Sequence, residues 1–317
     1  VINILQQSEI DGAVIERIMK DLHFYYNGYL FSKKAQKKMF NSDMFLYFLQ
    51  HYQRNMEYPD QILDNNVKTD YRKIKTLAFN FKDERTIEEL LEQDNISIMQ
   101  LSDRFQLDEM YKSKDNFKSL LFYLGMLTIK GVNEFGELVL TIPNYVSKKI
   151  YWEYFTETLR ETTELRTNEL MKVTASLRYY GDIRPFVDYV RQILEKLSNR
   201  DMQKFDEKYV KVVMFTLLDM DGFYLLQSEP EFRNGYADIL LTRSRQLAQY
   251  IKYEWLIELK CVKEKDRKKL DKIRNIGKEQ LKTYTESENI KKRFEDKEVK
   301  KALVCFIGKK EATVDEI

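Results

Sequence analysis

Two short apolar runs that end in charged residues constrain the fold of this chain most. The first lies in Gly235-Tyr-Ala-Asp238-Ile-Leu-Leu, and the second, after eleven mostly polar residues, is Tyr253-Glu-Trp-Leu-Ile-Glu258-Leu-Lys260. This pattern predicts two paired strands of a hairpin. Because side chains alternate along a strand, Glu258 and Lys260 share one face, and their apolar neighbours point into the core. With Asp238 on the neighbouring strand, we expect two carboxylates and one ammonium to meet at the edge of a sheet.

This expected group of side chains suits metal-assisted hydrolysis of a phosphodiester. Mg²⁺ or Mn²⁺ prefers oxygen ligands, which the carboxylates of Asp238 and Glu258 and the carbonyl of Leu259 can supply. Lys260 can hold the attacking water, help to deprotonate it, and offset the charge that develops on the phosphorane oxygens. The alternative is an ordinary surface hairpin that exposes a Glu and a Lys on its wet face.

A helix and a strand are predicted before the hairpin. Apolar residues recur at helical spacing over residues 206–218, and Glu207 lies near the start of this segment. The apolar run Phe223–Ser228 follows and is expected to be the first strand of the sheet.

A helix and a strand are also predicted after the hairpin. Residues 278–284 read as a helix that carries Gln280 and Tyr284 on one face. Residues 301–307 read as another buried strand. If this strand is parallel to its predecessor, a right-handed crossover places the helix over the sheet.

The order of these residues resembles the PD-(D/E)XK nuclease superfamily. The matching segments are Glu207, Gly235-x-Ala-Asp238, Ile257-Glu-Leu-Lys260 and Gln280-x-x-x-Tyr284. The resemblance implies that Asp238 and Glu258 bind metal and that Lys260 is the catalytic lysine. Ala237 stands where the superfamily's name has proline, but many members lack that proline.

The resemblance also implies auxiliary residues. Glu207 matches an acidic residue that is often found on the first core helix, and either Glu229 or Glu231 could replace it. Gln280 and Tyr284 match a helix that approaches nucleic acid in several members, so Gln280 is expected to assist catalysis and Tyr284 to contact nucleic acid.

Basic residues concentrate immediately after the second strand of the hairpin. Ten basic and four acidic residues lie between Lys260 and Lys282, whereas the net charge of the whole chain is only +2. This segment could bind phosphates near the metal with little regard to sequence, through residues such as Lys263, Lys278 and Lys282. The alternative is a solvated helix and loop.

The N-terminal half resembles the C-terminal helical part of a bacterial AAA-ATPase-like family. The similar segments, in the same order, are Phe24-Tyr-Tyr-Asn-Gly-Tyr29, Tyr58-Pro59 with Asp64-x-Asn66-x-x-x-Asp70, Leu124-Gly-Met-Leu-Thr128 and Ile142-Pro-Asn-Tyr145. No Gly-x-x-x-x-Gly-Lys-Ser/Thr motif occurs, so we expect no ATP binding by these residues and a nucleotide-binding region upstream.

Three domains are expected. They are a helical remnant of the lid region at 1–57, a helical domain with a small hairpin, winged-helix-like, at 58–160, and the nuclease-like domain at 161–317. In more detail, the sequence predicts a turn at Asn27-Gly28, an apolar helix over 117–128, a hairpin over 128–142 and one amphipathic helix over 151–180.

Composition excludes several classes of protein. A hydrophobic content of 43% with four Pro and ten Gly fits a helix-rich α/β (α+β) globular protein. Cys261 and Cys305 are too few for a disulfide framework and are expected to be buried, and His23 and His51 are expected to be structural or exposed. The absence of a signal peptide and of a long apolar stretch favours the cytoplasm and no membrane contact.

The sequence therefore predicts a mainly helical N-terminal region and a C-terminal restriction-endonuclease-like mixed sheet flanked by helices. The expected function is Mg²⁺- or Mn²⁺-dependent hydrolysis of nucleic acid, with DNA as the expected substrate, as the effector part of a larger AAA-ATPase-like protein. The alternative is a non-catalytic module that binds nucleic acid or a protein partner on a nuclease-like fold.

Overall fold

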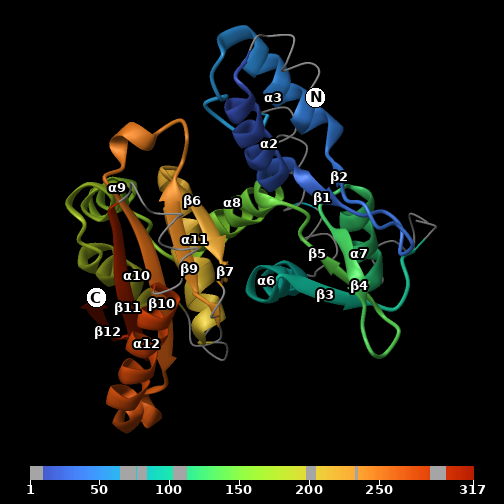
Figure 1. The fold of residues 1–317 in the computed structure, drawn as a ribbon. Coiled ribbons are helices and arrows are strands. Elements are labelled where there is room, and N and C mark those ends of the chain that lie inside the picture. Colours follow the sequence, from blue (N-terminus) through green and yellow to red (C-terminus); the bar gives the residue numbers. More distant parts are fainter. Residues whose placement is uncertain are drawn as a thin grey trace. The chain divides into compact units, whose positions relative to one another are not determined.

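The computed structural model describes residues 10–64, 76, 84–102, 113–197, 205–232, 235–285 and 298–317. The chain divides into two compact units, Val1–Tyr154 and Phe155–Ile317 (Figure 1). Within the described ranges, no helix combines the length and the apolar character that crossing a membrane requires.

The first unit begins with two helices joined by a short β-ribbon. The elements are α2 (Gly12–Tyr26), β1 (Asn27–Tyr29), β2 (Met39–Phe40) and α3 (Ser42–Asn55). The predicted turn at Asn27-Gly28 is wrong, because these residues belong to β1. Gly28 has a φ of 135°, and a Cβ atom there would lie 1.9 Å from the carbonyl oxygen of Pro143. Only glycine fits this close approach of two backbones.

A three-stranded antiparallel sheet with two helices completes most of the first unit. Its elements are α6 (Glu84–Gln93), β3 (Asn95–Ile98), α7 (Lys114–Tyr123), β4 (Thr128–Val132) and β5 (Leu138–Thr141), with the strand order β3-β5-β4. The predicted hairpin is present as β4 and β5, and β3 adds a strand to it. Helix α7 ends earlier than predicted, since the chain turns at Gly125, which has a φ of 72°.

The predicted single helix over 151–180 is wrong. Helix α8 (Tyr145–Thr162) ends before α9 (Thr167–Ala175), a π-helical turn η2 (Ser176–Tyr180) and α10 (Arg184–Lys196). At the break, the backbone N–H and the hydroxyl group of Thr163 both donate to the carbonyl of Leu159, at 2.8 and 2.7 Å. A threonine hydroxyl that competes for a helical acceptor favours a helix end.

The second unit contains a five-stranded sheet with the order β12-β11-β10-β9-β6. Its elements are α11 (Glu207–Asp221), β6 (Tyr224–Ser228), the two-residue strands β7 (Glu231–Phe232) and β8 (Gly235–Tyr236), β9 (Ile239–Arg243), β10 (Tyr253–Val262), α12 (Leu270–Thr285), β11 (Glu298–Ile307) and β12 (Glu311–Glu316). The predicted order of helix, three strands, helix and strand is confirmed, and β11 is parallel to β10. Strands β7 and β12 are additional, and the predicted strand that begins at Gly235 is divided into β8 and β9.

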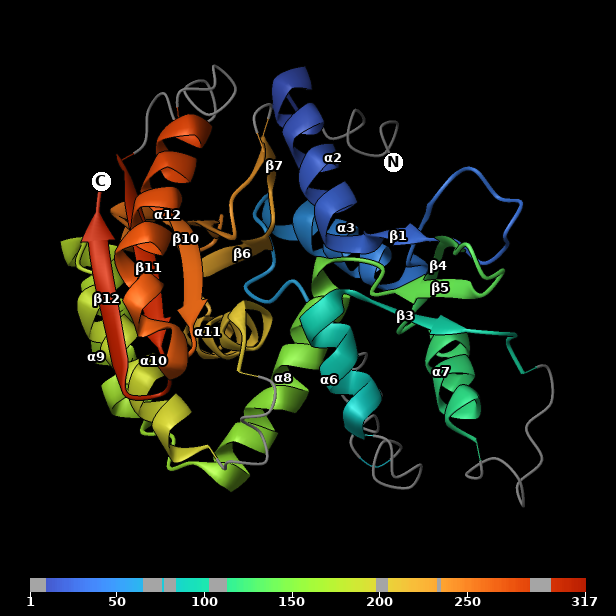
Figure 2. The same ribbon diagram turned by 90° about the horizontal axis from the view of Figure 1, so that it is seen from below.

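Helices cover both faces of this sheet (Figure 1 and Figure 2). On one face, Leu256 of β10 and Leu303 of β11 pack in a buried cluster with Leu281 of α12. On the other face, the indole N–H of Trp255 donates to the carbonyl of Leu177 in η2. The chain is thus a mixed α/β protein whose C-terminal sheet is flanked by helices, in agreement with the predicted restriction-endonuclease-like fold.

The two cysteines are not joined by a disulfide bond, and both histidines contact neighbouring side chains. Cys261 and Cys305 are free thiols, and Cys305 is fully buried as predicted, whereas Cys261 is half-buried. His23 packs edge-on against Phe40, and His51 hydrogen-bonds Asn55 one helical turn away.

Candidate active site

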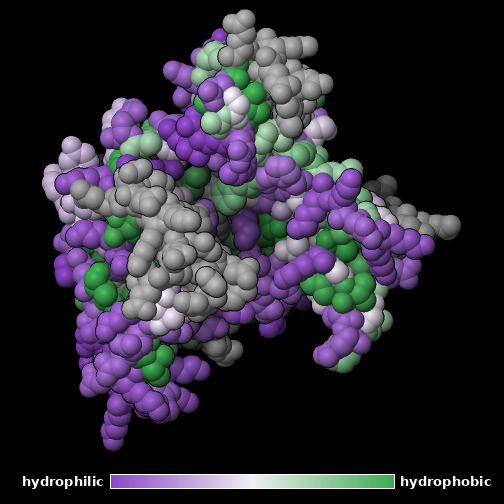
Figure 3. All heavy atoms as spheres, viewed as in Figure 1, coloured by the Kyte–Doolittle hydropathy of each residue, from purple (hydrophilic) through white to green (hydrophobic). Residues whose placement is uncertain are grey.

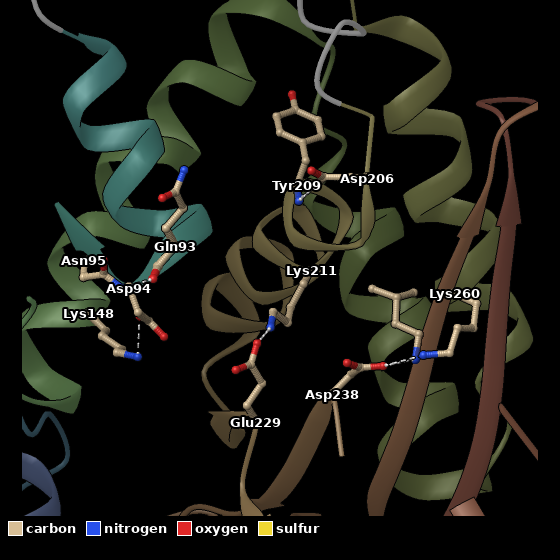
Figure 4. A network of polar contacts seen from close by, with 11 residues as sticks. Gln93, Asp94, Asn95, Lys148, Asp206, Tyr209, Lys211, Glu229, Asp238 and Lys260 are labelled. Atoms are coloured by element: carbon tan, nitrogen blue, oxygen red, sulfur yellow. Dashed lines mark hydrogen bonds and ion pairs between the residues drawn. The ribbon is translucent and has the colours of Figure 1, made fainter. Parts of the chain in front are cut away.

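Asp238, Glu258 and Lys260 meet on the sheet face that α12 covers. The Lys260 ammonium donates a 2.8 Å hydrogen bond to Oε1 of Glu258 and lies 3.8 Å from Oδ2 of Asp238. Figure 4 shows Asp238 and Lys260 pointing toward one another from neighbouring strands. The spatial grouping expected from the sequence is therefore present.

The end of the β9–β10 ladder explains the position of Asp238. Pairing between the two strands stops at Ile239 and Ile257, so Asp238 lies just outside the ladder. Its Oδ2 atom accepts a 2.8 Å hydrogen bond from the backbone N–H of Leu259. Since the N–H and C=O groups of a strand residue point to the same side, the Leu259 carbonyl also faces Asp238.

Glu258 is buried more deeply than the sequence indicates. Its side chain is only 2% exposed, which rules out the surface hairpin with a wet face. Burial first, and then the charge of Asp238, raise the pKa of Glu258 to about 7, although Lys260 opposes this. Its second oxygen, Oε2, is buried and has no hydrogen-bond partner among the described residues. An ionised Glu258 therefore lacks part of the solvation that its charge requires.

Lys260 is stabilised as a cation by the surrounding carboxylates. Burial alone would lower the pKa of its ammonium group, but the hydrogen bond with Glu258 and the charges of Glu258, Asp238 and Glu207 raise the pKa above its usual value. Lys260 is thus a fixed positive charge at neutral pH, and one lysine faces three acidic groups.

Glu207 reaches this group from the first residue of α11. Asp206 caps the helix by accepting a 3.0 Å hydrogen bond from the N–H of Tyr209. Glu207 accepts a 3.3 Å hydrogen bond from the N–H of Cys261 in β10. Burial raises the pKa of Glu207, Lys260 opposes the rise and Asp238 adds to it. Glu207 therefore lies within electrostatic range of the other site residues.

Glu229 and Glu231 are the two residues that could replace Glu207, and the structure describes the side chain of Glu229 only. Glu229 accepts a 2.8 Å hydrogen bond from Lys211 of α11, and this carboxylate is 60% exposed (Figure 4). The Glu229 backbone N–H donates to the Asp238 carbonyl at 3.1 Å. Glu229 thus contacts the backbone beside the site, while its carboxylate is held by Lys211. The side chain of Glu231 lies outside the described residues.

Gln280 and Tyr284 lie on the face of α12 that covers the site. Tyr284 is buried, and its pKa is raised by burial and by the charges of Glu258 and Asp238, while a hydrogen bond from Gln280 opposes the rise. The Oε1 atom of Gln280 is buried without a hydrogen-bond partner in the described part of the chain. Both residues border a groove of about 810 Å³, which is lined by Lys272, Asn275, Ile276, Glu279, Gln280, Thr283 and Tyr284. The surface around α12 is mostly hydrophilic (Figure 3).

The basic segment after β10 is largely paired with acidic residues of the same unit. Asp315 of β12 accepts hydrogen bonds from Arg274 at 2.6 and 2.9 Å, and Lys278 lies 3.1 Å from it. Lys282 is paired with Glu279 at 2.9 Å. Lys263 is exposed just before the 3-10 turn η5 (Glu264–Lys269). Of the expected phosphate-binding lysines, Lys278 and Lys282 therefore already have acidic partners.

The carboxylates around Lys260 can be compared with the set of ligands that a divalent cation requires. Where the structure describes the chain, no three His, Cys, Asp or Glu residues are close enough together to form a metal site by themselves. Mg²⁺, however, is commonly held by one or two carboxylates, with substrate oxygens and water completing the shell. Asp238, Glu258 and the Leu259 carbonyl provide such a set, and a cation would satisfy the buried Oε2 atom of Glu258.

Comparison with known proteins agrees with this geometry. Residues 205–316 match the family model described as the PD-(D/E)XK nuclease superfamily. A search of curated proteins found no match. The matched range begins just before Glu207 and ends in β12, so it contains every candidate site residue named above. The C-terminal sheet and its helices therefore form a domain similar to those of the PD-(D/E)XK nuclease superfamily.

Proposed function

We propose that the C-terminal unit catalyses divalent-metal-dependent hydrolysis of phosphodiester bonds in nucleic acid. The observation that carries this proposal is the contact of Lys260 with the buried Glu258, 3.8 Å from Asp238, on a domain that matches a nuclease superfamily. Three acidic groups, one of them buried, around a single lysine carry a net negative charge that opposes folding, and such groups are typical of functional sites. A hydrolytic metal site would use this charge to hold a cation.

Asp238 and Glu258 would hold the cation, together with the Leu259 carbonyl. When bound, Mg²⁺ or Mn²⁺ would polarise a phosphoryl oxygen and lower the pKa of a coordinated water. The unpartnered Oε2 of Glu258 and the mutual repulsion of the carboxylates both favour this cation.

Lys260, Glu207 and Gln280 would act on the reacting groups. Lys260 stays protonated, so it would orient the attacking water and offset negative charge on the phosphorane oxygens instead of serving as a base. Glu207, whose pKa is raised, would accept a proton from the attacking water or orient a second water molecule by a hydrogen bond. Gln280, whose Oε1 atom has no hydrogen-bond partner within the described ranges, lies at the edge of the α12 groove, where substrate would enter.

DNA is the substrate that we propose first. The AAA-ATPase-like resemblance of the N-terminal half supports a role as the effector part of a larger protein, in which an ATPase region would control access to the nuclease-like domain.

One observation favours a second function, a non-catalytic binding module. Glu258 Oε1 is occupied by Lys260, and Asp238 Oδ2 by the Leu259 N–H. A domain that had lost catalysis would retain such internal bonds without binding metal. Mn²⁺ titration separates the two functions, because only the hydrolytic site should bind Mn²⁺ in a manner that depends on Asp238 and Glu258.

The decisive test is cleavage of fluorescent DNA and RNA with Mg²⁺ or Mn²⁺. Glu258→Gln and Lys260→Ala should each lower the rate by about 10²–10³-fold, the usual cost of removing a group that stabilises the transition state. Glu195→Gln and Lys196→Ala are matched controls, since both residues are exposed on α10. Equal cleavage by wild type and both site variants would refute the proposal.

A further inference from the structure

Among the described residues, exposed lysines without an ion pair occur in both units, but those after β10 are interspersed with the acidic residues Glu264, Asp266 and Asp271. In that later segment, Arg267, Lys269, Arg274, Lys278 and Lys282 all form ion pairs with acidic residues of the second unit. Internal partners reduce the attraction of these cations for an external polyanion. The connection between β1 and β2, in contrast, contains exposed lysines and no acidic residue.

The lysine loop, residues 31–38, carries four exposed lysines. They are Lys33, Lys34, Lys37 and Lys38. The sequence contains no Asp or Glu between Asp21 and Asp43, and no ion pair to these lysines occurs within the described part of the structure. The loop is therefore a concentrated positive charge that faces solvent.

The first end of the lysine loop is fixed to the three-stranded sheet. The backbone N–H of Leu30 donates to the hydroxyl of Thr128 at 2.6 Å, and the carbonyl of Leu30 accepts from the N–H of Ile129 at 3.3 Å. Figure 1 and Figure 2 show β1 beside β4. The exposed Lys130 lies two residues beyond Thr128 on the same strand.

An aromatic side chain accompanies these charges at the start of the loop. Phe31 is 51% exposed, although its ring stacks on Tyr29 at 5.7 Å and meets the edge of Phe122 at 6.1 Å. At the other end, the N–H of Asn41 donates to the carbonyl of Tyr26 at 3.1 Å. Hydrogen bonds therefore fix the backbone on both sides of the lysine loop, and the lysines and Phe31 lie between these two fixed points.

We propose that the lysine loop binds the phosphate backbone of nucleic acid and holds the polymer on which the C-terminal unit acts. The inference rests on the proposed function for its choice of polyanion, because a phosphodiesterase site calls for a phosphodiester polymer. Exposed lysines bind phosphates without reading sequence, and an exposed aromatic ring beside them can stack on an unpaired base. An anionic membrane or an acidic protein is less suited to this combination.

The test is fluorescence anisotropy with a 30-nucleotide single strand and the matching duplex, in EDTA so that no cleavage occurs. Replacing Lys33, Lys34, Lys37 and Lys38 by Gln should weaken binding roughly 10- to 100-fold at 50 mM salt and make the slope of log affinity against log salt shallower by about 3 to 4. Phe31→Ala should weaken single-strand binding more than duplex binding.

A matched set of four lysines, each changed to Gln, serves as the control. Lys20, Lys172, Lys196 and Lys208 are exposed positions on four helices of the chain. This set should not reproduce the effect of the loop variant. An unchanged affinity and salt slope in the loop variant would overturn the inference. It would also be overturned if the wild type bound phosphatidylserine vesicles or poly-glutamate but not nucleic acid.

A small substrate separates this inference from the proposed function. Hydrolysis of bis-p-nitrophenyl phosphate needs no polymer binding, so the loop variant should retain it and Glu258→Gln should lose it. If the wild type cleaves neither this compound nor nucleic acid but nucleic-acid binding still requires the loop, the proposed catalysis fails and the lysine loop stands.

Discussion

The backbone N–H of Leu259 donates to the carboxylate of Asp238 across 2.8 Å, just beyond the last paired residues of β9 and β10. Asp238 thus has a structural role, as the acceptor for a backbone donor, and a proposed chemical role, as an anionic metal ligand. The two roles can be separated, because an asparagine keeps an acceptor oxygen but has no charge.

Asp238→Asn should remove activity while preserving the fold. We expect a loss of about 10²–10³-fold in cleavage rate with a change in unfolding free energy of about 1 kcal/mol or less. Asp238→Ala should cost about 1–3 kcal/mol more, because it leaves the Leu259 N–H without its partner. Urea unfolding of the three proteins measures this difference. Equal stabilities of the Asn and Ala variants would contradict the structural role.

Metal affinity should depend on pH through Glu258. Its pKa is raised to about 7, so below that pH the proton competes with the cation for the same carboxylate. Mn²⁺ affinity should therefore fall as the pH drops through 7, by up to about tenfold per unit for one displaced proton. Calorimetric titration between about pH 5.5 and 8.5 tests this, with Glu258→Gln as the control that should lose the dependence near pH 7.

Gly277 determines how closely α12 approaches the sheet. A Cβ atom at this position would lie 2.6 Å from Cδ1 of the fully buried Leu303, which pairs in register with Glu258. Gly277→Ala should therefore destabilise the protein by about 1–3 kcal/mol, despite the gain of about 1 kcal/mol that alanine usually brings to a helix.

Gly12 is the matched control for this substitution. It begins α2, and no atom lies within 4 Å of a Cβ built on it. Gly12→Ala should therefore be neutral or slightly stabilising. Thermal unfolding distinguishes the two positions, and a stabilised Gly277→Ala would show that Leu303 can move aside.

A buried ion pair should contribute to the stability of the second unit. Arg178 donates to both oxygens of Asp221 at 3.2 and 2.9 Å, and its guanidinium lies 3.7 Å from the centre of the Phe223 ring. Burial raises the pKa of Asp221, and Arg178 opposes that rise. Arg178→Met should destabilise the protein by about 3–5 kcal/mol, because it leaves a buried carboxylate unpaired.

The double variant Arg178→Met with Asp221→Leu provides the control. It removes both charges, so unfolding measurements should recover much of the lost stability. If the double variant were as unstable as Arg178→Met, packing around Phe223 would account for the loss instead of the unpaired charge.

Local patterns in the sequence predicted the elements that carry the candidate site. The alternation of apolar and charged residues defined β10, and the spacing of apolar residues defined α11 and α12. These signals depend only on residues that are close together in the sequence, so they can be read without the tertiary structure. Strand β12 was missed, because Glu311–Glu316 is mostly polar and lies at the edge of the sheet, where burial imposes little pattern.

The sequence by itself determined which residues could form the acidic group and on which strands they lie. Only the tertiary structure decided that Glu258 is buried, because α12 covers that face of the sheet. It also decided which basic residues are neutralised. Arg274 pairs with Asp315, forty-one residues away in the sequence, whereas the lysine loop has no acidic partner among the described residues. Burial and charge pairing depend on which segments meet in space, and spacing along the chain does not contain that information.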